Sequence, residues 1–181
     1  MKKQILIISI IIFIIFVGLS GCQESEAEKK LEKLGYANTE YSQKFGFNPP
    51  DGWTKDENDL YGIVRFYGPV VDDFNVNLGL SEPGTIGTGE TFESLIQEVE
   101  KNFPSVFTDF SMISSVSTTV NGIQAHEIIY TYTQGIYSLQ NKQVLINKNG
   151  VVYIITYAAS QSAFDDYELI VEQSVNTFTV V

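Results

Sequence analysis

The sequence is poor in the residues that make disulfides, zinc sites and basic surfaces. Its 181 residues include one Cys and one His, and 11 Lys and Arg stand against 22 Asp and Glu. One Cys excludes an internal disulfide, and one Cys with one His excludes a Cys/His zinc site. Nucleic acid is excluded as a partner, because phosphate binding needs clusters of Lys and Arg that a chain of net charge −11 lacks.

Apolar residues, in contrast, are abundant. They make up 44% of the chain, and charged residues make up 18%. This composition is sufficient for a hydrophobic core and excludes disorder of the whole chain. The length suits one domain.

The N-terminus has the pattern of a secretory signal peptide. Lys2 and Lys3 precede an apolar run from Ile5 to Leu19 that is interrupted only by Ser9 and Gly18. As a helix this run reaches roughly 22 Å, which is short of the ~30 Å hydrocarbon core of a bilayer. Two positive charges, a short apolar segment and small residues are typical of a signal peptide.

The residues after this run resemble the lipobox of bacterial-type lipoproteins: Leu19-Ser20-Gly21-Cys22. The resemblance implies that residues 1–21 are removed and that Cys22 carries a thioether-linked diacylglycerol, whose two acyl chains anchor the protein to the membrane. The alternative is an uncleaved signal anchor with Cys22 as an ordinary thiol. Both interpretations place the rest of the chain at the outer face of the cytoplasmic membrane, outside the cytoplasm.

The segment after the lipobox differs in composition from the rest of the chain. Residues 22–40 are rich in Glu and Lys and have few large apolar side chains. We interpret them as a charged tether. One domain is predicted over residues 41–181.

Hydrophobic periodicity predicts an antiparallel sheet and two helices in this domain. A helix with Thr91 as its N-cap has an apolar face and ends at Pro104. A second helix begins near Ser162, with Asp165 as part of a capping box. The turns Asn121-Gly122 and Asn149-Gly150 favour the type I′ conformation, in which both residues have positive φ. The predicted strands are 63–67, 74–80, 112–120, 123–133, 140–147 and 151–159.

The strand from Val151 to Ala159 has apolar side chains on both of its faces, so other elements must pack against both faces. The two amphipathic helices supply that cover if one lies on each face. We therefore predict an α+β fold, an α/β/α sandwich around a central antiparallel sheet. The alternative is a single-layer sheet with both helices on one side.

An ordered set of short motifs resembles the PsbP family over about residues 41–181. The set comprises Phe45-Gly46-Phe47, Pro49-Pro50-Asp51-Gly52-Trp53, Val64-Arg65-Phe66-Tyr67, Asn75-Val76-Asn77, Thr91-Phe92-Glu93, Asn121-Gly122-Ile123-Gln124-Ala125-His126-Glu127, Lys142-Gln143-Val144-Leu145, the run 150–159 and Phe164-Asp165-Asp166-Tyr167. The resemblance implies an α/β/α sandwich and a non-catalytic accessory or binding role outside a membrane. The family's plant member docks on a photosystem with a basic N-terminal segment, and the acidic tether here has no such segment. Photosystem binding is therefore not part of the expectation.

His126 is the one imidazole that could act as a base. In a strand it shares a face with Gln124, Ile128, Tyr130 and Tyr132, and Glu127 points the opposite way. Glu127 therefore cannot orient His126 as a Ser/His/Asp triad requires. No nucleophile elbow and no His-Glu-x-x-His helix is present in the sequence. We predict no catalytic residues and interpret His126 as a hydrogen-bonded strand residue.

Two other features are candidate ligand sites. The acidic pairs Asp72-Asp73 and Asp165-Asp166 could give oxygen ligands to Ca²⁺, or, together with His126, to a transition metal. Solvated turns and the dipole of a helix N-terminus explain the same pairs without a metal. An aromatic groove is the second candidate, and cross-strand packing is its alternative. Its residues are Tyr130, Tyr132, Tyr137, Tyr153 and Tyr157.

Together these features predict a lipid-anchored, extracytoplasmic protein that binds a protein partner at the membrane without catalysis. No cofactor is predicted. A module that binds Ca²⁺ or a transition metal is the first alternative, and a hydrolase-type enzyme is the second. A hydrolase would need two carboxyl groups that meet in a cleft and have perturbed pKa values.

Overall fold

The computed structural model describes residues 45–56, 64–81 and 83–180. The predicted signal peptide, Cys22 and the tether lie outside these residues. Among the described residues, no helix is long and apolar enough to cross a membrane. In chain order the elements are β1 Phe45–Gly46, β2 Thr54–Lys55, β3 Val64–Val71, β4 Phe74–Leu80, β5 Gly84–Thr85, α3 Phe92–Val106, β6 Thr108–Val120, β7 Ile123–Gln134, β8 Tyr137–Lys148, β9 Val151–Ser160, α4 Phe164–Val175 and β10 Thr179–Val180.

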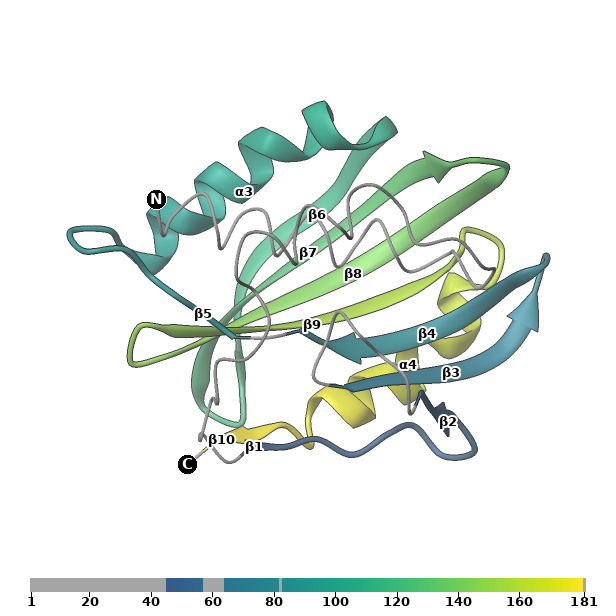
Figure 1. The fold of residues 1–181 in the computed structure, drawn as a ribbon, viewed down its shortest axis with the longest axis horizontal. Coiled ribbons are helices and arrows are strands. Elements are labelled where there is room, and N and C mark those ends of the chain that lie inside the picture. Colours follow the sequence, from purple (N-terminus) through teal and green to yellow (C-terminus); the bar gives the residue numbers. More distant parts are fainter. Residues whose placement is uncertain (1–44, 57–63, 82, 181) are drawn as a thin grey trace, which may run out of the picture.

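One antiparallel sheet dominates the molecule (Figure 1). Its strand order is β2-β3-β4-β9-β8-β7-β6, and the short β5 also pairs with β9. Strands β6 to β9 pair in chain order as an antiparallel meander, with a tight turn between each strand and the next. Strands β1 and β10 make a separate two-stranded sheet.

The Asn-Gly turns have the predicted backbone conformation. Asn121 and Gly122 have φ of 50° and 76°, and Asn149 and Gly150 have φ of 53° and 85°. Positive φ at both central residues matches the right-handed twist of the flanking strands. A third turn of this kind joins β3 to β4 at the pair Asp72-Asp73, for which the sequence analysis gave a solvated turn as one interpretation: Asp72 and Asp73 have φ of 52° and 60°.

The predicted α/β/α sandwich is wrong. Of the described residues, 55% lie in strands and 21% in helices, and the helices are α3 and α4 alone. A helix is about 10 Å wide and neighbouring strands lie about 4.8 Å apart, so one helix covers about two strands. Two helices therefore cannot form layers over a sheet of this width, and the protein is a predominantly β structure.

Two hydrophobic clusters make up the core, and each includes one helix. The α3 cluster joins helix α3 to Ile128, Tyr130 and Tyr132 of β7 and to alternate residues of β9. The α4 cluster joins helix α4 to the intervening residues of β9, among them Tyr153 and Tyr157. Because successive side chains of a strand point to opposite sides, the two clusters lie on opposite sides of β9. We call these the α3 side and the α4 side.

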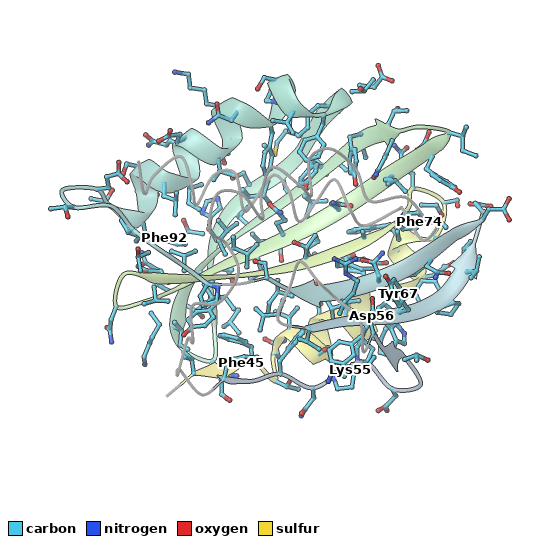
Figure 2. All side chains as sticks on the ribbon, viewed as in Figure 1. Phe45, Lys55, Asp56, Tyr67, Phe74 and Phe92 are labelled. Atoms are coloured by element: carbon cyan, nitrogen blue, oxygen red, sulfur yellow. The ribbon has the colours of Figure 1, made fainter. Side chains whose placement is uncertain are left out.

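Helix α3 packs by the apolar face that the sequence predicts. Its buried residues are Phe92, Leu95, Ile96, Val99 and Phe103. In Figure 2, Phe92 lies at the start of α3 and Phe74 at the start of β4, at opposite ends of the α3 cluster.

The ends of the helices agree with the sequence only in part. Thr91 caps α3 as predicted, in a reciprocal capping box with Ser94. The prediction that Pro104 ends α3 is wrong, because the helix continues to Val106. A proline in the last turn removes one N–H while leaving the later Phe107 N–H free to donate to the Phe103 carbonyl.

The predicted capping box at the start of α4 is also wrong. The helix begins at Phe164, and its N-cap Ala163 makes no side-chain hydrogen bond. The Ser162 hydroxyl donates instead to Asp72 in the β3–β4 turn.

Candidate functional site

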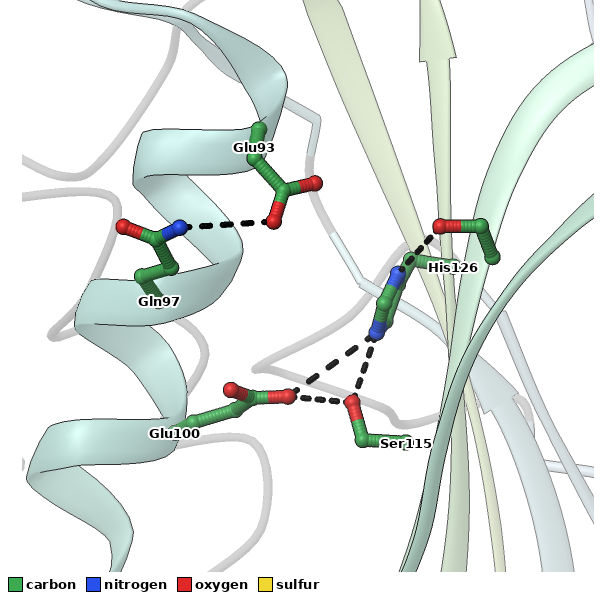
Figure 3. A network of polar contacts seen from close by, with 6 residues as sticks. Glu93, Gln97, Glu100, Ser115 and His126 are labelled. Carbon is green, nitrogen blue, oxygen red and sulfur yellow. Dashed lines mark hydrogen bonds and ion pairs between the residues drawn. The ribbon is translucent and has the colours of Figure 1, made fainter.

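His126 lies at the centre of a polar cluster between α3 and the sheet (Figure 3). Its Nε2 is 2.7 Å from Ser115 Oγ and 3.9 Å from Glu100 Oε1, and its Nδ1 is 3.4 Å from Ser117 Oγ. The Ser115 hydroxyl donates to Glu100 Oε1. We call these four residues the His126 cluster.

Three elements position the His126 cluster. Ser117 and His126 are direct cross-strand partners on β6 and β7. Ser115 lies two residues before Ser117 on β6, on the same side of the sheet. Glu100 comes from α3, where it is one helical turn from the buried Ile96 and Phe103. Glu100 therefore borders the apolar face and reaches the sheet as the helix packs.

The donation from Ser115 to Glu100 limits how protons can be shared in this cluster. A serine hydroxyl has one proton, and Ser115 donates its proton to Glu100. With that proton used, a hydrogen bond between Ser115 Oγ and His126 Nε2 forms in the tautomer that carries its proton on Nε2. In a Ser/His/Asp triad the same nitrogen is unprotonated and accepts the serine proton, and a carboxylate holds the other ring nitrogen. Here a hydroxyl, that of Ser117, faces the other nitrogen.

A second polar cluster lies on the α4 side. Lys142, only 2% exposed, has its Nζ 2.7 Å from Glu168 Oε1, 2.9 Å from Glu172 Oε1 and 3.5 Å from Glu127 Oε2. Burial by itself lowers the pKa of Lys142, but the carboxylates of Glu168, Glu172 and Glu127 outweigh it and raise that pKa. We call these four residues the Lys142 cluster.

The sequence analysis missed the Lys142 cluster, although signals for it exist. Glu168 and Glu172 are four residues apart and so share one face of α4. Lys142 lies in the middle of a strand that is otherwise largely buried, where a cation needs partners. Glu127 points away from His126, as predicted, and joins this cluster on the opposite side of β7.

The candidate metal ligands are distributed over separate parts of the fold. Asp72 and Asp73 form the β3–β4 turn, where Asp72 Oδ2 accepts hydrogen bonds from Ser160 and Ser162. Asp165 and Asp166 lie in the first turn of α4. Within residues 45–56, 64–81 and 83–180, no three His, Cys, Asp or Glu side chains are grouped so that they could hold a metal ion.

The candidate groove tyrosines belong to two different clusters. Tyr130 and Tyr132 are buried on the α3 side, where Tyr137 packs against the same cluster, and Tyr153 and Tyr157 are buried on the α4 side. Burial raises the pKa of Tyr130, Tyr132 and Tyr157. The hydroxyl of Tyr157 donates to the Phe164 carbonyl at 2.7 Å, at the start of α4. The structure therefore brings these rings into the core from both sides of the sheet.

Comparison with known proteins identifies the fold. No family model matches the chain, and no curated protein matches it. Several solved structures do. LpqN of Mycobacterium tuberculosis, which is involved in cell envelope biogenesis, has a TM-score of 0.61 at 11% identity, with 89% of this chain and 99% of that chain covered.

Two further structures are similar over most of their length. PA94 of Pseudomonas aeruginosa, a protein of unknown function proposed to be a regulator, has a TM-score of 0.58 at 15% identity, with 76% of this chain and 96% of that chain covered. The cyanobacterial PsbP of Synechocystis has a TM-score of 0.54 at 14% identity, with 76% and 86% covered. The chain shares its fold with these proteins. At such low identities, the likeness extends to the fold alone.

Proposed function

We propose that this protein is a lipoprotein of the outer face of the cytoplasmic membrane that binds a membrane-associated protein without catalysis. The observation that carries the proposal is the placement of Cys22. It follows a short apolar leader and two small residues, and a charged tether separates it from a folded domain. The likeness to LpqN, a protein of cell envelope biogenesis, supports this location.

The polar clusters support the non-catalytic part of the proposal. Ser115 donates to Glu100 while His126 donates to Ser115, so neither group is arranged to activate a nucleophile. The Lys142 ammonium is held by three carboxylates, which keep it charged. A charged lysine cannot act as a base or form a Schiff base. In each cluster the polar side chains form hydrogen bonds or ion pairs with one another.

Mass spectrometry of the membrane-bound protein tests the anchor. We expect the N-terminal peptide to begin at Cys22 and to carry the mass of a diacylglycerol, and we expect the protein to sediment with membranes. Cys22→Ser should lose the modification and leave the membrane fraction if it is cleaved. Ser25→Ala, three residues further on, is the matched control and should behave like the wild type. A native chain that retains Met1, or an unmodified Cys22, would overturn the anchor.

Crosslinking in intact membranes tests the partner. We expect the wild-type protein to crosslink repeatedly to the same membrane-associated protein, and the cleaved form of Cys22→Ser to lose that product because it is no longer held at the surface. Ser115→Ala should retain it, since the proposal gives Ser115 no role in binding. Repeated experiments that recover no partner would contradict the proposed function while leaving the anchor intact.

A further inference from the structure

Strand β6 is the outer strand at one end of the main sheet (Figure 1). It spans 13 residues, and among the described strands β7 is its one neighbour. An outer strand presents a row of backbone N–H and C=O groups that can pair with another strand. Natural proteins usually interrupt such an edge with lysine, proline or a very short strand.

Strand β6 lacks most of these interruptions. Residues 110–120 contain no charged residue and no proline, in a chain whose net charge is −11. Three apolar side chains of β6 are exposed: Met112 by 36%, Ile113 by 55% and Val116 by 49%. The strand is otherwise rich in Ser, Thr and Val, which suit a half-exposed sheet surface.

Irregularities are confined to the first half of β6. Asp109 has a φ of 52°, and the register with β7 shifts between Thr108 and Ser111 and again between Met112 and Ser114. From Ser114 to Val120 the pairing with β7 is regular. The second half of β6 is therefore a regularly paired, uncharged strand, which suits pairing on its outer side.

We propose that the outer edge of β6 pairs with β6 of a second copy of this protein, in an antiparallel ladder centred within residues 114–120. Two copies related by a two-fold axis present the same uncharged segment to each other, so no like charges oppose across the ladder. If two copies paired through almost any other acidic surface of this chain, carboxylates of one copy would face carboxylates of the other. The proposal is independent of the proposed function, since it needs neither the lipid nor a partner.

The opposite end of the sheet favours a closed dimer. There the outer strand β2 has two residues, one of them Lys55, and the neighbouring β3 contains Pro69. A two-residue strand offers little backbone for pairing, and proline cannot donate to a ladder. Each copy therefore has one long edge among its described strands, and pairing two of these edges closes the assembly.

The net charge predicts how this dimer responds to salt. Two acidic bodies repel each other, and the Debye length falls from about 30 Å at 0.01 M salt to about 8 Å at 0.15 M. Because the ladder itself is uncharged, salt screens the repulsion without weakening the pairing. The dimer should therefore become tighter as ionic strength rises.

Disulfide trapping in the full chain tests the geometry. Single cysteines are introduced at Ser114, Val116 and Thr118, and membranes that contain the protein are treated with a mild oxidant. In a two-fold antiparallel ladder only a residue near the axis meets its own copy. Dimer formation should therefore peak at one position and fall on either side. Leu169→Cys, on the exposed surface of α4, is the matched control and should give no dimer.

A charge substitution tests the edge itself. Val116→Glu places like charges in the ladder and should raise the dissociation constant of the detergent-solubilised dimer roughly tenfold, as measured by sedimentation velocity. Leu169→Glu adds the same charge elsewhere and should leave the constant within about twofold. A monomer at every salt concentration, equal trapping at all positions including Leu169→Cys, or trapping to a different protein would each overturn the proposal.

Discussion

Strand β7 contributes neighbouring residues to two polar clusters with opposite physical characters. On the α3 side, His126 joins hydroxyl groups and one carboxylate that is about one-third exposed. On the α4 side, Glu127 joins a buried ammonium and two further carboxylates. One step along the chain therefore separates a cluster built mainly on hydroxyl hydrogen bonds from a cluster built on ion pairs.

This difference determines which interactions hold each helix against the sheet. Helix α3 is held chiefly by its five buried apolar residues, and Glu100 adds a hydrogen bond at their border. Helix α4 has fewer large buried side chains and places two of its carboxylates on Lys142. We therefore expect α3 to tolerate changes in its polar cluster and α4 to respond strongly to them.

The largest expected effect is that of removing the charge of Lys142. Lys142→Met keeps an apolar stem but leaves Glu127, Glu168 and Glu172 facing one another without a cation. Loss of one partner of a buried ion pair costs 3–5 kcal/mol, and the partial exposure of these carboxylates favours the lower end, about 3 kcal/mol. Urea denaturation measures the free energy of unfolding. Lys148→Met, near the end of the same strand, should cost less than about 0.5 kcal/mol. Equal losses in the two variants would remove the assigned role of the Lys142 cluster.

Alkaline pH should destabilise both sides of the sheet together. The pKa values of Tyr130, Tyr157 and Lys142 are all raised in the folded state. A group whose pKa is raised by folding contributes its full stabilisation at pH values below its unfolded-state pKa. That contribution is lost as the pH rises through its folded-state pKa. Stability should therefore be level up to about pH 10 and should then fall by about 1 kcal/mol per pH unit for each such group. Urea midpoints measured between pH 8 and 11 test this. A midpoint that stays constant to pH 11 would contradict the burial of these groups.

Local features of the fold were predictable because local chemistry decides them. The Asn-Gly turns require positive φ at two adjacent residues, and few other dipeptides adopt it readily. The cap at Thr91 and the buried face of α3 follow from spacings of three and four residues. Each of these predictions depends on residues within one or two turns of chain.

Local spacing marks single members of the polar clusters but not their partners, because the partners meet only when the helices pack on the sheet. Ser115 and Glu100 are 15 residues apart, Lys142 and Glu172 are 30 apart, and Ser162 and Asp72 are 90 apart. The last pair meets because β4 lies beside β9, which no local pattern specifies. The fold class failed for a related reason. An apolar strand requires cover, but its sequence does not say how many strands lie beside it, and two helices do not form layers over a sheet of this width.

The smallest expected effect is the coupling within the His126 cluster, and it gives the sharpest comparison of the two sides. A double-mutant cycle of Ser115→Ala and Glu100→Gln should give a coupling energy of about 1 kcal/mol in urea denaturation, because one hydrogen bond to a partly exposed carboxylate joins the two residues. The same cycle with Lys142→Met and Glu168→Gln should give a larger value, because the ammonium that Glu168 contacts is buried. If the first coupling equalled or exceeded the second, burial of the cation would not be the source of the difference. Helix α3 would then depend on its polar cluster as much as α4 does.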